Sequence, residues 1–395
     1  MRTYERTHPW LTFRIDLRHA QPRLWMNLGE AASKCEHIAG VPLRPVTAER
    51  LHLLYLAKGA AATTAIEGNP LTEKEVLQHL EGKLKMPLSK EYLTQEIDNI
   101  VAVCNQIADH LQKGDESLTA KRVCEFNRGV LENLKLKEDV LPGQLRTYPV
   151  VVGNAYRGAP AEDCEYLLER FCEWLAGPDF EPPSGMETVY AIIKAIVAHL
   201  YLAWIHPFGD GNGRTARLIE FQILLTAGVP TPAAHLLSNH YNVTRAEYYR
   251  QLDRASKSSG DILGFLDYAV QGFAEGLREQ LSVIRDQQWD VTWRNYVHEL
   301  FRDKNSVSDQ RRRRLALDLG LQRDLVDIGK LTELTPRLAK AYATKTSKTL
   351  QRDLAELDRL GLIERNVRSV RAKKEVIIAY APWRKRKPRI PQGLI

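Results

Sequence analysis

Residues suited to acid–base and phosphate chemistry lie within twelve positions of this 395-residue chain. They form the stretch HPFGDGNGRTAR, residues 206–217. His206 is a candidate general base, because the pKa of an ordinary imidazole lies near neutrality. Residues 210–213 favour a loop, and their glycines allow positive φ and let backbone N–H groups approach an anion. The stretch therefore predicts a phosphate-binding loop with a base beside it.

The same stretch supplies side chains for the rest of a nucleotide site. Arg214 and Arg217 are spaced i, i+3, so on a helix they share one face and offer two planar forks of donors to phosphate oxygens. Asp210 is a candidate oxygen ligand for Mg²⁺, and Asn212 a candidate amide donor. The pattern becomes helical from Arg214, so the loop would precede a helix N-terminus, where free N–H groups favour anions.

A long apolar segment must position this loop. Residues 189–205 predict a helix, and Pro207 disfavours helical geometry in the residue before it. His206 is therefore expected at the exit of a helix, facing a turn. Considered alone, His206 would more often be a histidine buried in the core; the adjacent loop favours a catalytic role.

These residues resemble the signature of Fic-domain proteins, His-Pro-Phe-x-[Asp/Glu]-Gly-Asn-Gly-Arg-x-x-Arg, with every fixed position filled. The resemblance implies an all-helical core and the transfer of AMP from ATP to a Ser, Thr or Tyr hydroxyl of a target protein or of the chain itself. Related members with Lys in place of Gly213 act as kinases. Gly213 therefore favours adenylyl transfer over phosphoryl transfer.

The resemblance also implies roles for individual residues. His206 would deprotonate the target hydroxyl, Phe208 would anchor the loop, and Asp210 would hold Mg²⁺. The phosphates of ATP would be cradled by Gly211, Asn212 and Gly213, with Arg214 on the β phosphate and Arg217 on the γ phosphate. Such fixed donors stabilise the charge that develops on the phosphate oxygens during attack at the α phosphorus.

Residues 63–69, TTAIEGN, resemble the inhibitory [Ser/Thr]-x-x-x-Glu-[Gly/Asn] motif that precedes the core in one regulatory class of this family. The resemblance assigns regulatory positions to Thr63, Glu67 and Gly68. A bidentate pair of Glu67 with Arg217 would compete with the γ phosphate and inhibit the enzyme. Without the catalytic motif, Glu67-Gly68 would be an ordinary helix ending. In some relatives this Glu also positions a water that removes AMP, and the sequence leaves that activity open.

Three further segments are candidates for binding the target or the base. Residues 141–154 are rich in β-forming residues and predict a small hairpin. In the Fic family such a flap pins the target as an added strand, although a purely structural hairpin is the alternative. Residues 237–241 and 245–249 resemble the family's stretch after the catalytic helix, where a tyrosine and nearby polar residues line the base and ribose pocket. The resemblance implies that Tyr248 or Tyr249 could stack on adenine, with at least one of them in the core, and that Asn239 and His240 are weaker candidates for the same pocket.

The chain as a whole predicts a mainly α protein. Helices are expected at residues 24–38, 47–66, 71–83, 89–113, 118–135 and 261–302, after a short apolar alternation at residues 11–15. We expect an N-terminal helical region at 1–110, a catalytic core at 111–303 and a third domain at 304–395. No run of about 18 apolar residues or signal peptide is found, and five scattered cysteines fit reduced thiols. These features predict a cytoplasmic protein without a membrane segment.

The C-terminal part is basic, because residues 281–395 hold 26 Lys+Arg and 14 Asp+Glu. Four arginines at 311–314 favour a solvated helix face or linker. Helices at 331–342 and 347–360, with strands at 362–365 and 375–380, resemble a winged helix-turn-helix domain, which implies DNA or another protein as the partner of residues 320–380. Candidate DNA contacts are Lys345, Lys348 and Arg352 on the helix and Arg368, Arg371, Lys373 and Lys374 on the wing. The basic tail, residues 384–389, would add nonspecific affinity for anions.

Two classes of function follow from these observations. One is an autoinhibited protein adenylyltransferase that uses ATP and Mg²⁺. The other is a transcriptional regulator in which the nucleotide site acts as a sensor, and the retained base His206 argues against it. The sequence also allows a nucleotide donor other than ATP. It does not specify the target protein or the oligomeric state, for which a dimer is one alternative.

Overall fold

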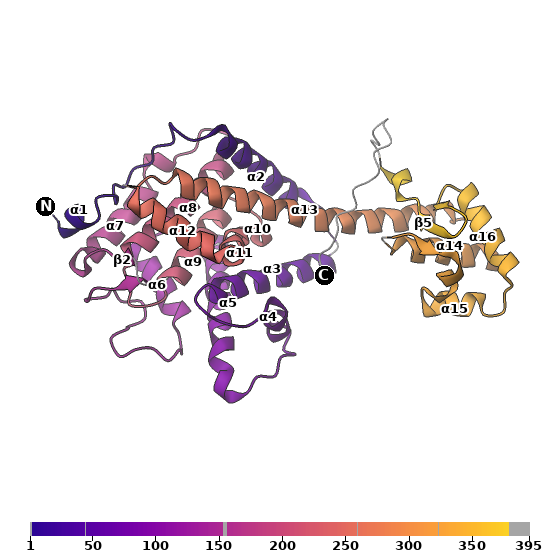
Figure 1. The fold of residues 1–395 in the computed structure, drawn as a ribbon, viewed down its shortest axis with the longest axis horizontal. Helices are drawn as coiled ribbons and strands as arrows, with labels where there is room; N and C mark the ends of the chain where they lie inside the picture. The colour runs from indigo at the N-terminus through magenta and orange to yellow at the C-terminus, as the bar shows by residue number, and fades with distance from the viewer. Residues whose placement is uncertain (1, 44, 153–155, 259, 323, 379–395) are drawn as a thin grey trace. The chain divides into compact units, whose positions relative to one another are not determined.

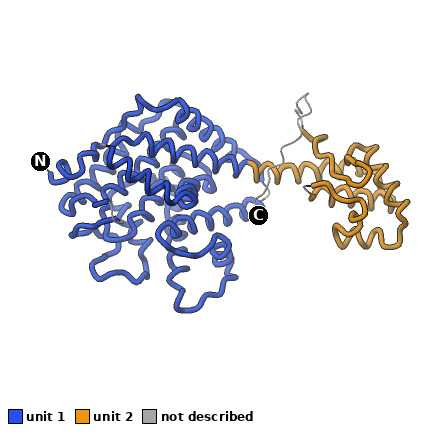
Figure 2. The backbone as a smooth tube through the Cα atoms, in the orientation of Figure 1, with its two compact units in different colours: residues 1–281 blue, residues 282–395 orange. Residues whose placement is uncertain are grey.

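The computed structural model describes residues 2–43, 45–152, 156–258, 260–322 and 324–378. The chain divides into two compact units, residues 1–281 and 282–395 (Figure 2). Each has its own hydrophobic core, and each is described by itself.

Unit 1 is built almost entirely of helices, as predicted (Figure 1). Its helices are α1 (Thr3–Thr7), α2 (Pro22–Gly40), α3 (Pro45–Ala65), α4 (Glu73–Leu80), α5 (Glu91–Gln112), α6 (Ala120–Val130), α7 (Cys164–Leu175), α8 (Glu187–Ile205), α9 (Asn212–Thr226), α10 (Thr231–Ala234), α11 (Leu236–Val243), α12 (Arg245–Lys257) and the first half of α13 (Leu263–Leu300). The helices predicted between residues 24 and 135 are confirmed. Helices α1, α7, α10, α11 and α12 are additional to those predicted, and residues 11–15 form no strand.

The packed pair α8 and α9 forms the centre of unit 1. Almost every residue of α8 from Ala191 onward is buried, as expected of a helix that is apolar all round. Helix α9 is also buried, yet it carries polar side chains, including Arg214, Arg217 and Glu220. Buried charges require partners or a ligand, so α9 is marked as a functional element.

The predicted hairpin lies further along the chain than expected. Strands β1 (Val151–Val152) and β2 (Tyr156–Arg157) pair antiparallel, so the hairpin spans residues 151–157 instead of 141–154. Asn154 lies outside the described residues. Residues 141–150 instead form turns, and Leu145 makes an isolated antiparallel bridge to Phe208. Residues 145 and 146, before the hairpin, therefore contact the loop that follows His206.

The expected domain boundaries at 110/111 and 303/304 differ from the division into two units. Residues 1–281 share a single core, and unit 2 begins inside α13, at Ser282. The second half of α13 contributes Trp293 and Val297, and Phe301 follows it, to the core of unit 2. A continuous helical pattern conceals this change of partner, because periodicity does not report which core a helix enters.

Unit 2 contains, after α13, the elements α14 (Val307–Gly320), β3 (Val326–Asp327), α15 (Pro336–Tyr342), α16 (Ser347–Arg359), β4 (Ile363–Arg365) and β5 (Ser369–Ala372). The strands form an antiparallel sheet in the order β3-β5-β4. The predicted second wing strand at 375–380 is wrong over its described part, because residues 374–377 form a 3₁₀ turn and β5 uses the preceding basic stretch. Residues 379–380 and the tail at 384–389 lie outside the described residues.

Helix α8 is long and apolar enough to cross a membrane by length and composition alone, although it lacks the uninterrupted apolar run sought in the sequence. In this protein 78% of that stretch is buried, as expected of a core helix. All five cysteines are free, and four of them are buried, which agrees with reduced structural thiols.

Candidate active site

His206 caps the C-terminal end of α8 in a left-handed conformation, with φ +51°. Its Nδ1 lies 3.3 Å from the Ala203 carbonyl oxygen, so the Nδ1–H tautomer donates this bond and leaves Nε2 free to accept a proton. Burial lowers the pKa of His206 to about 4 and outweighs the opposing effect of the Ala203 bond. The imidazole is therefore neutral at physiological pH, as a general base must be.

The loop after His206 is closed by Asn212. Its side chain accepts from Phe208 N at 2.9 Å and donates to Phe208 O at 2.8 Å. Helix α9 begins at Asn212, two residues earlier than predicted, and Gly211 precedes it with φ +76°. The side-chain amide of Asn212 is thus committed to the loop. The groups that can face an anion are the backbone N–H groups at the start of α9, which have no intrahelical partners.

Two residues that the sequence analysis had not identified hold this loop. Asn127 of α6 is fully buried, donates to Asp210 O at 2.9 Å and accepts from Gly143 N at 3.0 Å. Arg146 is also buried, and its guanidinium donates to four carbonyls, those of His206 (2.8 Å), Tyr148 (2.7 Å), Ile205 (3.5 Å) and Ala159. Arg146 therefore ties the catalytic loop to the chain on both sides of the hairpin.

Replacement of Arg146 by Lys is expected to lower the free energy of unfolding by about 1–3 kcal/mol, because the three donors on a single ammonium nitrogen cannot match four spread carbonyls, and buried acceptors are left unsatisfied. Urea unfolding measures this loss. Arg170→Lys, at an exposed position of α7, is the control and should change it by less than about 0.5 kcal/mol. Equal stability of the two variants would contradict the structural role of Arg146.

The two arginines of α9 are buried and only partly satisfied. Arg214 donates to Asp210 Oδ1 at 3.0 Å, and the Glu96 carboxylate lies 3.9 Å away, beyond hydrogen-bond distance. Within the described residues, Nε and Nη1 of both Arg214 and Arg217 have no hydrogen-bond partner. Buried guanidinium donors without acceptors are costly, so this face of α9 is suited to an anionic ligand.

Glu67 pairs with Arg217, as the sequence analysis expected. The Arg217 Nη2 lies 2.5 Å from Glu67 Oε1 and also donates to Thr63 O at 2.9 Å. The pair uses one guanidinium nitrogen, so the expected bidentate geometry is not formed. Burial alone would raise the pKa of Glu67, but the attraction of Arg217 outweighs it and the pKa is lowered. Thr63 contributes its carbonyl, and Gly68 ends the turn with φ +109°.

Gly213 makes room for this carboxylate. A Cβ at Gly213 would collide with Glu67 Oε1, and Arg217 Nη1 would lie 3.2 Å from it. The absence of a side chain at position 213 therefore allows the contact between Glu67 and Arg217.

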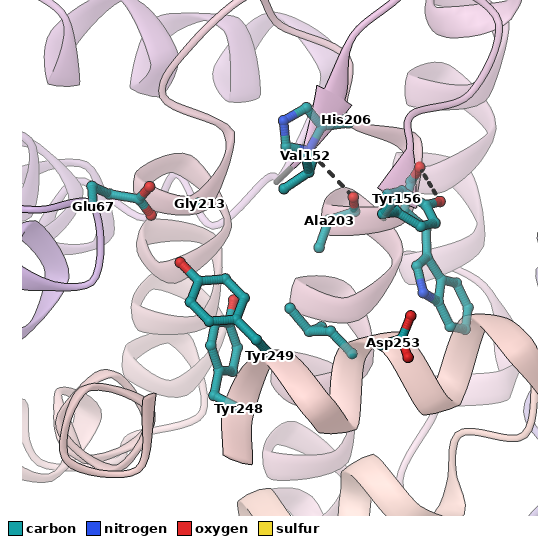
Figure 3. A pocket seen from close by; sticks show the side chains of 11 residues that line it. Glu67, Val152, Tyr156, Ala203, His206, Gly213, Tyr248, Tyr249 and Asp253 are labelled. Atoms are coloured by element: carbon teal, nitrogen blue, oxygen red, sulfur yellow. Dashed lines mark hydrogen bonds between the residues drawn. The ribbon is translucent and has the colours of Figure 1, made fainter. Parts of the chain in front are cut away.

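Glu67, His206 and Gly213 line one cavity of about 390 Å³, which the flap residues Val152 and Tyr156 border (Figure 3). Tyr248 and Tyr249 of α12 form a wall of this cavity, together with Leu252 and Asp253. Tyr248 is buried, whereas Tyr249 is 42% exposed, as expected if one of the two belongs to the core. Asn239 and His240 do not line it; the His240 ring packs against Tyr268 and Gly272.

A buried polar network behind the cavity holds Tyr248 in place. Its hydroxyl lies 2.8 Å from His199 Nε2. His199 Nδ1 lies 3.2 Å from Glu220 Oε2, a close polar contact without hydrogen-bond geometry. Tyr241 donates to the other oxygen of Glu220 at 2.9 Å. These residues come from four helices, α8, α9, α11 and α12, so the network fixes the wall of the cavity relative to the catalytic helices.

Residues 117–224 match the Fic/DOC family. A protein adenylyltransferase Fic from Nematostella vectensis is 31% identical over 53% of this chain and 45% of its own length. The protein adenylyltransferase fic-1 of Caenorhabditis elegans is 29% identical over 56% of this chain and 41% of its own length. The chain thus spans less than half the length of these curated relatives.

Two solved structures have a similar fold. A Fic family protein from Desulfovibrio desulfuricans has a TM-score of 0.54 at 20% identity, covering 89% of this chain and 96% of its own. Fic-1 from C. elegans has a TM-score of 0.53 at 24% identity, covering 66% and 73%. The family match, the relatives and the helical fold agree with the motif at 206–217. The motif lies inside the stretch, residues 117–224, that matches the Fic/DOC family.

Proposed function

We propose that this chain is a protein adenylyltransferase, which transfers AMP from ATP to a hydroxyl group of a protein. The observation that carries the proposal is the arrangement at one cavity. A neutral histidine at the end of α8 lines it and, beside it, so does Gly213 at the N-terminus of α9, a helix whose two arginines are incompletely paired. A sensor of nucleotides would need the second feature but not the first. The curated relatives that match the chain bear the name protein adenylyltransferase.

The reaction assigns one step to each group. Nε2 of His206 takes the proton of the target hydroxyl, whose oxygen forms a bond to the α phosphorus of ATP while the bond to the β phosphate oxygen breaks and pyrophosphate leaves. The backbone N–H groups of Asn212 and Gly213, with Arg214 and Arg217, stabilise the charge on the phosphates.

Mg²⁺ fits one acidic side chain of this site. Asp210 is half exposed beside Arg214. The described residues contain no cluster of three or more His, Cys, Asp or Glu side chains for a metal. Mg²⁺ commonly takes one or two carboxylates together with substrate phosphates, so Asp210 would hold it only with ATP. The ion would supply charge neutralisation to the phosphates.

The hairpin offers a way to hold the target. Strand β1 pairs with β2 alone among the described strands, and Val151 is 59% exposed. We infer that an extended segment of the target adds to this hairpin by main-chain hydrogen bonds, which places its hydroxyl near His206. Side chains of the hairpin would then contribute little to the selection of a particular target sequence.

The chemistry is tested with ATP labelled on either the α or the γ phosphate, incubated with the full chain, Mg²⁺ and a cell lysate. Adenylyl transfer leaves the α label, and not the γ label, on protein, whereas phosphoryl transfer leaves the γ label. Protein carrying only the γ label would overturn the proposal. The assay uses the Glu67→Gly variant beside the unmodified chain, since this variant frees Arg217 and is expected to transfer more label.

For unit 2 we infer a winged helix, from the element order α14-β3-α15-α16-β4-β5. The acidic side chains of α16 are matched within the unit: Asp353 with Arg311 (2.6 Å) and Arg312 (2.9 Å), Glu356 with Arg359 and Asp358 with Arg365. The exposed cations Lys348 and Arg352 are thereby left to contact phosphates of nucleic acid or an acidic protein. Titration of duplex DNA at two salt concentrations, with Lys348→Gln/Arg352→Gln for comparison, distinguishes these partners.

A further inference from the structure

Unit 2 contains a cavity of about 450 Å³ that the Fic chemistry does not use. Its walls come from facing stripes of α13 and α14, with one side chain from α15. Helix α13 contributes Arg294 and His298, one turn apart, and α14 contributes Arg313, Arg314 and Leu317. Because all these residues belong to unit 2, the cavity is complete within that unit.

The charge of this cavity is strongly positive. Four arginines, including Arg337 of α15, and one histidine face a single carboxylate, Asp290, which is paired with Lys374 at 2.7 Å. Arg337 is held by the buried Asp318. In the part of unit 2 that the structure describes, Arg294, Arg313 and Arg314 form no ion pair.

Two other arginines of the same unit, unlike these three, are paired with a carboxylate. Arg311 and Arg312 precede the cavity residues directly in the sequence, and both bond to Asp353. The run of four arginines therefore divides in two: Arg311 and Arg312 pair with Asp353 of α16, and Arg313 and Arg314 line the cavity. The expectation that residues 311–314 form a solvated face or linker is wrong for Arg311, which is 7% exposed.

We propose that this cavity binds a small molecule that carries two or three linked phosphates. Planar guanidinium forks match phosphate oxygens, and neighbouring arginines that form no ion pairs are stabilised by a multiply charged anion. The volume lies in the range of small-molecule sites. Leu317 and Leu321 supply an apolar margin on which the remainder of a nucleotide can lie, so nucleotides and inorganic polyphosphate are the two sources of this chemistry.

The site is tested by calorimetric titration of the full chain with tripolyphosphate, ADP and ATP. Arg294→Gln/Arg313→Gln should weaken one class of sites by about a hundredfold, taking tenfold, or about 1.4 kcal/mol, for each arginine. Arg285→Gln/Arg302→Gln removes the same charge from exposed positions outside the cavity and should leave that class unchanged. The adenylyltransfer site is identified separately, because its binding is lost in Arg214→Gln and kept in the cavity variants.

A second variant guards against misfolding. Leu321→Glu places a carboxylate on the exposed margin of the cavity, where Leu321 is 57% exposed, and should weaken tripolyphosphate without lowering the melting temperature. Tighter binding of ADP than of tripolyphosphate would identify a nucleotide as the ligand. Equal binding of the two would identify inorganic polyphosphate as the ligand. An unchanged affinity for tripolyphosphate in both cavity variants would overturn the proposal. The proposal would also fail if these variants lost binding of duplex DNA but still bound tripolyphosphate.

Discussion

The Glu67→Gly variant is expected to transfer AMP about 10–100-fold faster than the unmodified chain, within the usual range of coupling between two sites. In the resting protein the Glu67 carboxylate holds Arg217 Nη2, the group proposed to bind the γ phosphate. Removal of this carboxylate frees the guanidinium and the space beside Gly213 together. Incorporation of the α label into protein, followed over time with Mg²⁺ and lysate, measures the change.

Two controls separate the loss of this contact from a general effect of substitution. Glu67→Gln keeps the size of the side chain but weakens its attraction for Arg217, so an intermediate rate is expected. Glu73→Gly, at an exposed position of α4, should have the rate of the unmodified chain. Equal rates for Glu67→Gly and the unmodified chain would rule out inhibition by Glu67.

Stability should move in the opposite direction to activity. Without Glu67, the buried Arg217 loses its counterion, and an unpaired buried charge is destabilising. ATP supplies a replacement anion. We therefore expect saturating ATP to raise the melting temperature of Glu67→Gly more than that of the unmodified chain.

The features that could be predicted best from the sequence are those specified by residues close together in the chain. The motif at 206–217 specifies a loop, a helix start and two arginines within twelve positions. In the structure His206 and Gly213 line one cavity with Glu67, and Glu67 pairs with Arg217. Helix α8 could be predicted because its apolar residues are consecutive. Glu67 is 150 positions from Arg217, and the family motif, not periodicity, pointed to their pairing.

The residues that the sequence analysis had not identified act through partners that are distant in sequence. Arg146 and Asn127 bond to carbonyls that any residue type could supply, so no pattern indicates them. The second wing strand lies at residues 369–372 instead of the predicted 375–380, because its partners, β3 and β4, pair with four residues of a longer basic and β-forming stretch. The turn at 374–377 follows from that choice.

His206→Ala, introduced into the Glu67→Gly chain, is expected to reduce AMP transfer by about 10²–10⁴-fold, the usual contribution of a general base. Nε2 is the atom that would accept the hydroxyl proton, because Nδ1 faces the Ala203 carbonyl. ATP binding should change little, since the phosphate groups are held by α9. His37→Ala, at an exposed position of α2, is the matched control and should retain full activity.

The pH dependence of kcat/KM provides an independent test of the base. Burial lowers the pKa of His206 to about 4, so the neutral and active imidazole is present above that pH and is lost as the pH falls through it. A histidine with the ordinary pKa of about 6.5 would be only about one quarter neutral at pH 6. The activity of Glu67→Gly should therefore be nearly constant from pH 7.5 to pH 6, and more so because the Glu67 charge that raises this pKa is gone. A fall of kcat/KM to about one quarter at pH 6 would mean that His206 titrates with its ordinary pKa during the reaction. The burial seen in the structure would then not describe the reacting enzyme.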